Sequence, residues 1–364
     1  MTSTAIPVSL LTGFLGSGKT TLLNHLLADA RTGRVAVVMN EFGEIGLDHD
    51  LVESATEAMA LLQSGCLCCT VRGDLAQTLS DLKARRDRGD IAFERVVIET
   101  TGIADPGPIL QSLVMDPALA DDFKLDGVLT TVDCATGPAT LDAQFEAVQQ
   151  IAMADRLILT KADLALPADI ATLDGRLAAI NPGAPRLRAD HGAVDPLALF
   201  GVAPGADSPR SEALHWVAAN PAKPDPAPGG PSAVRPFGLA QDRGLFERPA
   251  TATGLHDGRI SSQSAQIDHP ISPIVFDLWL DSLMRRVSGR ILRLKAVVHV
   301  EGIEHPFALH GVQHVFHPPT PLPQWPRDDK VSRIVVIGRD LPAGYLEESL
   351  ALLHSRPDTT AHGH

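Results

Sequence analysis

Short apolar runs alternate with helical patterns through the first two hundred residues of the chain. Five runs rich in β-branched residues are expected to form strands: residues 8–12, 34–39, 95–99, 127–132 and 156–160. Helices are expected between them at residues 19–28, 74–86, 143–153 and 168–180. Runs such as RVVIE and RLILT fit central strands, because buried parallel strands are apolar on both faces. We therefore expect an α/β fold with a doubly wound, mostly parallel sheet.

The pattern changes after about residue 220. The stretch PAKPDPAPGGP is dense in proline and glycine, and little apolar sequence follows it before residue 271. A helical pattern then appears in IVFDLWLDSLMRRV, followed by the strand-like runs RILRLKAVVHV and RIVVIG. We expect a first domain at residues 1–215, a linker at 216–265, a second, smaller α+β domain at 266–355 and a flexible tail at 356–364.

Length and composition favour a folded, two-domain protein. The chain has 364 residues, against roughly 100–200 per domain, and is 44% hydrophobic and 21% charged. Its formal net charge of −13 argues against a nucleic-acid partner, since such a partner requires a basic face that displaces counterions from phosphates.

The N-terminal pattern argues against export and membrane insertion. The first apolar run lacks a positively charged start and ends in a glycine loop instead of a cleavage site. No run reaches the roughly 18 apolar residues that would span a bilayer. We therefore expect a cytoplasmic protein with no membrane partner.

Residues 13–20, GFLGSGKT, match the P-loop pattern directly after an expected strand and at the start of an expected helix. Phosphates need several converging backbone N–H donors, and glycines leave such a loop free of Cβ atoms. Lys19 is expected to meet the β- and γ-phosphates, and the Thr20 hydroxyl to coordinate Mg²⁺. The predicted nucleotide-binding residues here are Gly13, Gly16, Ser17, Gly18, Lys19, Thr20 and Thr21.

A second motif, Thr160-Lys161-Ala162-Asp163, resembles the guanine-reading Asn-Lys-x-Asp sequence. An aspartate there accepts from both N1–H and the 2-amino group of guanine. Adenine offers no such donor pair, so binding it would leave a buried carboxylate unpaired. Thr160, Lys161 and Asp163 are therefore predicted to select GTP, with Thr160 in the usual place of asparagine.

Residues 99–102, Glu-Thr-Thr-Gly, resemble a GTPase switch at the end of an expected strand. Glu99 is expected to hold Mg²⁺ through its waters and the Gly102 amide to sense the γ-phosphate, so Lys19, Glu99 and Gly102 are the predicted catalytic residues. Residues 40–48 look like the first switch, whose glycines suit a loop that orders with GTP. Ile103 stands where Ras-like enzymes place a water-orienting glutamine, which predicts slow intrinsic hydrolysis.

Three of the four cysteines are Cys66, Cys68 and Cys69, too crowded for a normal disulfide framework. They could converge on one ion only if the backbone turns, which Gly65 allows. Thiolates favour Zn²⁺ or Cu(I) over Mg²⁺, with Co²⁺ or Ni²⁺ as alternatives. Three ligands leave one tetrahedral position of zinc open, which suits a site that releases its metal. Buried apolar cysteines or a redox pair are the alternative interpretations.

In this order, GFLGSGKTT, NEFGEIGLD, GCLCC, ETTGIADP and TKAD resemble the CobW-type family of P-loop GTPases. The resemblance continues in HDGRISS, GRILRLKAVV, Trp325 and VVIGRDL, although Lys295-Ala296 stands where Lys-Gly is common. It implies a P-loop GTPase domain, a C-terminal CobW domain, and GTP-dependent delivery of a metal, often zinc and in some cases cobalt, to an apo-metalloprotein client.

Two other functions fit the same residues: a metal-buffering or sensing protein in which nucleotide only stabilises the fold, and an ATP-dependent P-loop enzyme. The second domain is expected to recognise the client, and a homo-oligomer is left open. The histidines of the second domain do not define a single metal-binding face by their spacing. They are His299, His305, His310, His314 and His317.

Overall fold

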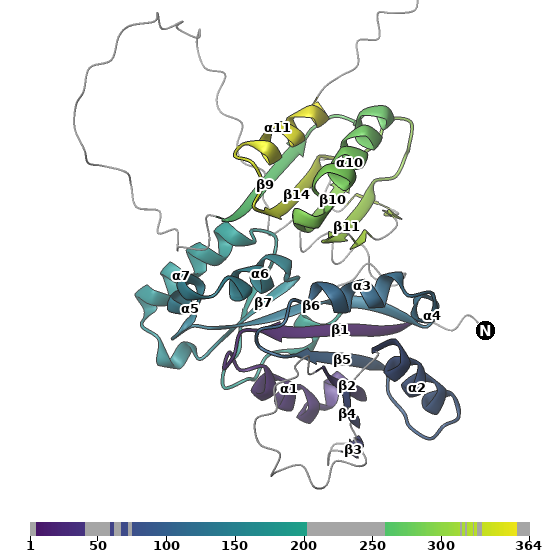
Figure 1. The fold of residues 1–364 in the computed structure, drawn as a ribbon, viewed down its shortest axis with the longest axis vertical. Helices are drawn as coiled ribbons and strands as arrows, with labels where there is room; N and C mark the ends of the chain where they lie inside the picture. Colours follow the sequence, from purple (N-terminus) through teal and green to yellow (C-terminus); the bar gives the residue numbers. More distant parts are fainter. Residues whose placement is uncertain are drawn as a thin grey trace, which may run out of the picture.

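Two β-sheets, each with its own helices, organise the chain (Figure 1). The structure is a computed structural model that describes residues 5–40, 59–61, 67–71, 75–201, 259–313, 315–316, 319–322, 324–325 and 330–354. At residues 40, 59–61, 67–71, 288 and 315 it describes the backbone alone.

The first sheet has eight strands in the order β3-β4-β2-β5-β1-β6-β7-β8. All neighbouring pairs are parallel except β3 and β4, so the expectation of a mostly parallel sheet is confirmed. The strands are β1 (Ile6–Gly13), β2 (Val35–Asn40), β3 (Met59–Leu61), β4 (Leu67–Val71), β5 (Arg95–Thr100), β6 (Phe123–Asp133), β7 (Arg156–Thr160) and β8 (Arg186–Arg188).

Helices cover both faces of this sheet, which makes the fold doubly wound. Leu22, Leu23 and Leu26 of α1 pack on one face, while α3 and α6 lie on the other, toward the second sheet (Figure 1). The helices are α1 (Lys19–Ala28), α2 (Leu75–Asp87), α3 (Gly107–Met115), α4 (Pro117–Ala120), α5 (Gly137–Ala143), α6 (Phe145–Met153), α7 (Pro167–Ile180) and α8 (Pro196–Leu199), with the 3₁₀ turns η1 (Ala30–Thr32) and η2 (Ala162–Leu164).

The second sheet is antiparallel and has the order β12-β11-β10-β14-β9, with β13 paired to β11. One helix, α10, buries Phe276, Trp279 and Leu283 against it, which confirms the expected α+β unit. The elements are β9 (Ile260–Ile267), α10 (Pro273–Val287), η4 (Ser288–Arg290), β10 (Ile291–Val298), β11 (Phe307–Val312), β12 (Val315–Phe316), β13 (Thr320–Pro321), β14 (Ser332–Arg339), α11 (Tyr345–Ala351) and η5 (Leu352–His354).

Strand β9 begins at Ile260, so residues 260–265 form a strand where the end of the linker was expected. The strand sequence ISSQSAQI is polar, because β9 is the edge of its sheet and pairs only with β14 among the described strands. Such a strand shows little of the apolar alternation by which strands are found in a sequence.

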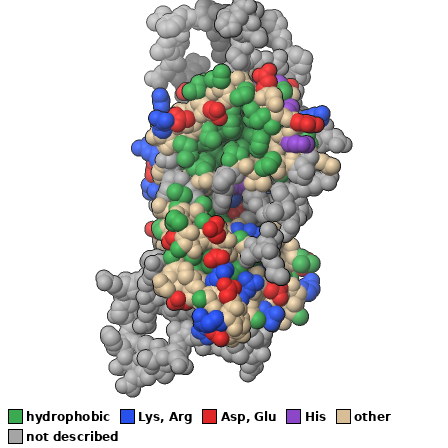
Figure 2. Space-filling model, turned by 90° about the vertical axis from the view of Figure 1, so that its right-hand side faces the viewer, with side chains coloured by type: hydrophobic (Ala, Val, Ile, Leu, Met, Phe, Trp, Pro, Cys, Tyr) green, Lys and Arg blue, Asp and Glu red, His purple; other side chains and the backbone are tan. Residues whose placement is uncertain are grey.

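Apolar side chains gather over one side of the second unit (Figure 2). On α10, Ile274 and Leu278 are 70% and 66% exposed, and they lie four residues apart on one side of the helix. In the part of the chain that the structure describes, no helix is long and apolar enough to cross a membrane.

The two units share one apolar cluster. Leu292 and Val297 of β10 belong to the same buried cluster as Val148 and Ile151 of α6. A buried ion pair lies beside it: Asp155, between α6 and β7, binds Arg293 and, at 2.7 Å, the Nζ atom of Lys295. The second unit is therefore anchored on α6 by apolar contact and by charge.

Candidate functional site

The loop after β1 folds as a P-loop should. Gly16 and Gly18 have φ values of 73° and 93°, in the left-handed region that favours glycine. A Cβ on Gly13 would lie 2.3 Å from Oγ1 of Thr131 on β6, so the loop backbone passes too close to its neighbour for a side chain. The Ser17 hydroxyl hydrogen-bonds that of Thr131 at 2.7 Å. The neighbouring strand thus fixes the loop.

Helix α1 begins at Lys19, and its N-cap, Gly18, offers no side-chain hydrogen bond to the first turn. The first N–H groups of the helix are therefore available to an anion, which the helix dipole also favours. The Nζ atom of Lys19 donates to the carbonyl oxygens of Gly13 at 2.8 Å and Phe14 at 3.2 Å. Burial lowers the pKa of Lys19, and the charge of Glu99 acts in the opposite direction.

Glu99 is the last residue but one of β5 and lies beside the first turn of α1. Its Oε1 accepts from the Thr20 hydroxyl at 3.2 Å, while its buried Oε2 has no hydrogen-bond partner among the described residues. Burial raises the pKa of Glu99, although Thr20 and Lys19 act against this rise. A buried carboxylate with a free oxygen beside a threonine hydroxyl fits a Mg²⁺ site, because Mg²⁺ prefers oxygen ligands.

Thr160, at the end of β7, is tied to the P-loop. Its hydroxyl donates to the carbonyl oxygen of Ser17 at 2.7 Å and lies 3.2 Å from that of Val132. The side chain also contacts Gly18, where an added Cβ would lie 3.4 Å from Thr160 Cγ2. The residue in the usual place of asparagine therefore holds this segment against the phosphate loop.

Lys161 follows with a left-handed φ of 54°, and its Nζ atom pairs with Asp133 Oδ2 at 2.8 Å. Burial would raise the pKa of Asp133, but hydrogen bonds from Lys161 and from the amides of Thr136 and Ala135 lower it. Asp163 lies exposed in η2. Asp133 was not among the site residues predicted from the sequence, although a carboxylate at the carboxyl end of a parallel strand is a signal for a ligand site.

Residues 99–106, ETTGIADP, are called the switch segment below. Gly102 lies against the P-loop, where an added Cβ would be 2.6 Å from the backbone nitrogen of Leu15. On its other side, the buried Gln150 of α6 donates to the carbonyl oxygens of Gly102 at 3.1 Å and Ala104 at 3.0 Å. The switch segment therefore bridges the P-loop and α6. Gln150 was not among the site residues predicted from the sequence.

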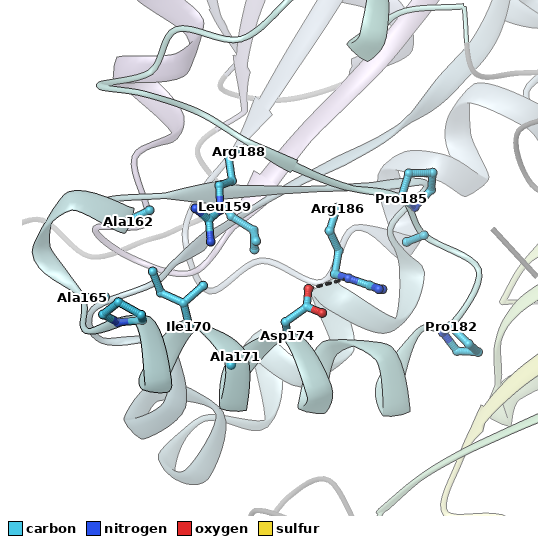
Figure 3. Close-up of a pocket in the computed structure, with 12 residues that line it drawn as sticks. Leu159, Ala162, Ala165, Ile170, Ala171, Asp174, Pro182, Pro185, Arg186 and Arg188 are labelled. Atoms are coloured by element: carbon cyan, nitrogen blue, oxygen red, sulfur yellow. Dashed lines mark ion pairs between the residues drawn. The ribbon is translucent and has the colours of Figure 1, made fainter.

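A groove of about 680 Å³ lies beside the Thr160-Lys161 segment, between β7, β8 and α7 (Figure 3). Nine of its twelve lining residues have apolar side chains, and an ion pair of 2.6 Å between Arg186 and Asp174 joins β8 to α7. Leu159 and Ala162 line it on either side of the Thr160-Lys161 dipeptide. Its described lining contains no P-loop residue, so the groove is separate from the phosphate-binding loop.

The predicted metal site lies largely outside the described residues. Cys66 and residues 41–48 of the predicted first switch are not described, and of Cys68 and Cys69 only the backbone is, in β4. Their Cα partners on β2 are Val37 and Val38. The three-cysteine site thus stays a prediction.

The described part of the chain contains no group of three or more His, Cys, Asp or Glu residues that could hold a metal ion. In the second unit His299 packs edge-on against Trp325, with ring centroids 5.4 Å apart. His314 and His317 lie outside the described residues. A metal site on the histidines of the second unit therefore has no support among the described residues.

A parallel sheet, a glycine loop after its central strand and Lys19-Thr20 at the start of the next helix define the class: a P-loop nucleotide-binding protein. Residues 7–188 match the CobW/HypB/UreG nucleotide-binding domain, and residues 260–353 match the cobalamin synthesis protein cobW C-terminal domain. The chain therefore belongs to the CobW family of P-loop GTPases.

Similar proteins span nearly the whole chain. It is 32% identical over 348 residues to the zinc chaperone YjiA of Escherichia coli (strain K12), covering 95% of this chain and 98% of that protein. The crystal structure of Zn(II)-bound YjiA GTPase from E. coli matches with a TM-score of 0.70 at 30% identity, over 96% and 99% of the two chains. The zinc-regulated GTPase metalloprotein activator 1 of Schizosaccharomyces pombe is 39% identical over 197 residues, 52% of this chain and 47% of that protein.

Proposed function

We propose that this protein is a cytoplasmic, GTP-hydrolysing metallochaperone. It binds a transition metal, zinc first and cobalt as the alternative, through Cys66, Cys68 and Cys69, and it delivers the metal to an apo-metalloprotein client. The observation that carries the proposal is the similarity to a zinc chaperone over 95% of the chain, joined to a phosphate loop with every predicted glycine in place.

The nucleotide is held by groups with separate tasks. The first turn of α1 and the Lys19 ammonium bind the phosphates, and Asp163 accepts from the two guanine donors. Thr160 keeps the base-reading segment at a fixed distance from the P-loop through its bond to Ser17. Thr20 and Glu99 would hold Mg²⁺, which neutralises charge on the transferring phosphoryl group when it is bound.

Hydrolysis by this site alone is slow. Ile103, next to Gly102, is 57% exposed and has no polar atom in its side chain with which to orient water. A group from the first switch, a partner or a bound metal must therefore supply that role. If bound metal raises the rate of GTP hydrolysis, the protein hydrolyses GTP only after it has bound its metal.

The cysteine strand lies close to the switch in the sheet. Val38 of β2 is the Cα partner of Cys69 on one side and of Ile98 on the other, and Ile98 precedes Glu99. Only β2 lies between β5 and β4, so a shift of β5 caused by the nucleotide can be transmitted to β4 through one strand. Coupling of about 1–3 kcal/mol would change metal affinity about 5- to 150-fold between nucleotide states.

Metal release measured with GTP, GDP and a non-hydrolysable GTP analogue tests the proposal. A chaperone releases its metal at a rate that depends on the nucleotide, and transfer to an apo-protein acceptor needs the hydrolysable form. A buffering or sensing protein, the first alternative, shows the same release in all three. Reducing conditions throughout keep the thiols competent as ligands.

The second alternative, an ATP-dependent enzyme, is tested by competition. If Asp163 reads guanine, ATP in excess leaves bound GTP in place. Displacement of GTP by equimolar ATP contradicts the guanine assignment and favours the ATPase.

A further inference from the structure

One side of α6 carries the second unit. Three residues at four-residue intervals, the spacing of one helix face, contact it. Phe145 lies under Arg259 at 4.0 Å, Gln149 Oε1 accepts from Arg339 at 3.3 Å, and Met153 Sδ lies 3.9 Å from Gln313 Nε2.

The same helix holds the switch segment through Gln150, whose Nε2 donates to the carbonyl oxygens of Gly102 and Ala104. Because Gln149 and Gln150 are neighbours on one helix, a displacement of α6 reaches both the switch segment and the second unit. Just after the C-terminal end of α6, the buried ion pair of Asp155 with Arg293 and Lys295 holds β10 of the second unit.

Gln313 reaches the switch segment directly from the second unit. Its Nε2 donates to Asp105 Oδ1 at 3.1 Å and lies 3.4 Å from Oδ2, across 208 positions of sequence. Its amide also lies on Gly107, where an added Cβ would be 2.1 Å from Gln313 Oε1. Asp105 Oδ1 accepts from the Gly107 amide as well, so the contact falls where the switch segment becomes α3.

The backbone of Gln313 is unusual for its residue type. It has a left-handed φ of 52°, between β11 and β12, where glycine or asparagine would be less strained. The hairpin turn requires it: Gln313 follows Val312, which pairs with Val315 on β12, and two-residue hairpin turns need a positive φ. Here the backbone aims the side-chain amide at Asp105 and Gly107.

We propose that Gln313 is a positioning residue through which the C-terminal domain and the bound nucleotide influence each other. The inference rests on the proposed function and on the role predicted for the Gly102 amide, which is to sense the γ-phosphate. Asp105 lies three residues further along the same segment. A movement of Gly102 that differs between GTP and GDP changes the Gln313 contact, and linkage requires that the contact in turn changes the relative affinities of the two nucleotides.

Two variants remove the contact in different ways. Gln313→Ala deletes the donor, and Gly107→Ala fills the space of the Gln313 amide with a methyl group while suiting the helix start better than glycine. Each should change the ratio of GTP to GDP affinity by about fivefold, the lower end of allosteric coupling, since the contact is exposed. The double variant should equal the single ones, because both changes remove one interaction. Gln263→Ala, an exposed glutamine of the same domain, is the matched control and leaves the ratio unchanged.

Amide hydrogen exchange supplies a readout that a merely structural role would not move. Exchange in residues 307–316 should differ between GTP-analogue and GDP complexes of the wild type and lose this difference in Gln313→Ala, at an unchanged melting temperature. An affinity ratio that stays at the wild-type value in both single variants overturns the coupling while leaving GTP binding intact. A wild-type protein that binds neither nucleotide overturns the proposed function itself and the coupling with it.

Discussion

The hydroxyl of Thr160 donates to the carbonyl oxygen of Ser17 over 2.7 Å, which ties the end of β7 to the P-loop. Both residues are almost completely buried. A valine at position 160 keeps the shape of the side chain and loses the donor. We expect Thr160→Val to lower GTP affinity about 5- to 30-fold, as the loss of about 1–2 kcal/mol predicts. Isothermal titration measures this, and Thr160→Ser, which keeps the hydroxyl, is the control that should bind normally.

Lys19→Ala should abolish tight GTP binding and leave the fold intact. The ammonium makes two charge-assisted hydrogen bonds to phosphate oxygens in the proposed complex, each of about 1.5–3 kcal/mol, so affinity falls roughly 100-fold or more. Stability does not suffer, because burial already disfavours the charged form of Lys19. Thermal unfolding without nucleotide checks the fold, and normal GTP affinity in this variant would exclude the P-loop as the phosphate site.

Asp163→Asn should lose the preference for guanine. An amide either presents a donor to the guanine donors or turns its oxygen toward them and accepts as a neutral group. Two hydrogen bonds to a charged acceptor are weakened together, which predicts a fall of about 100-fold or more in the GTP-to-ATP affinity ratio. The measurement is competitive displacement of a fluorescent GTP analogue. An unchanged ratio places base recognition on another residue.

Asp155→Asn should loosen the two domains. Removing one partner of a buried ion pair costs about 3–5 kcal/mol, because Arg293 and Lys295 are left buried without their carboxylate. Burial raises the pKa of Asp155, but Arg293 and Lys295 lower it further, and the net direction is downward. The carboxylate therefore stabilises the fold above its unfolded pKa of about 3.9 and loses this effect as pH falls. Urea unfolding should show a large difference from wild type at pH 7 that shrinks below about pH 4.

Local patterns in the sequence predicted several helices and strands of the first domain. Helix α1 and strand β7 begin and end where the apolar spacing predicts them, because each is bounded by a motif residue, Lys19 and Thr160. The P-loop glycines were predictable for the same reason: their φ values follow from the phosphate-binding geometry. The helix α3 was missed, since its sequence opens with Gly107-Pro108 and its N-cap is Pro106, which offers no side-chain hydrogen bond.

The contacts between the domains could not be predicted in this way. Asp155 and Arg293 are 138 positions apart, and Gln313 and Asp105 are 208 apart, so no local pattern joins them. The roles of Lys295 and Ala296 are visible only in the folded structure. Lys295 binds Asp155, while Ala296 belongs to the core of its own domain. Alternating directions of neighbouring strand residues explain this division.

The proposed function requires that Cys66, Cys68 and Cys69 form a metal site coupled to GTP. A serine at position 66 replaces a soft thiolate by a harder hydroxyl that stays protonated near neutral pH, so it should remove most of the metal affinity. Nucleotide binding in metal-free buffer should hardly change, because Lys19, Thr20 and Asp163 lie in other motifs. Cys134, which is buried in the structure, offers Cys134→Ser as the matched control.

The most direct test is the GTPase rate of wild type, Cys66→Ser and Cys134→Ser with and without stoichiometric Zn²⁺ or Co²⁺, under reducing conditions. The rate of wild type and Cys134→Ser should rise with metal, and that of Cys66→Ser should not, because linkage requires the metal to bind before it can bias the switches. An equal response to metal in wild type and Cys66→Ser would contradict a coupled metal site at the cysteines, since that site would then lie elsewhere in the chain.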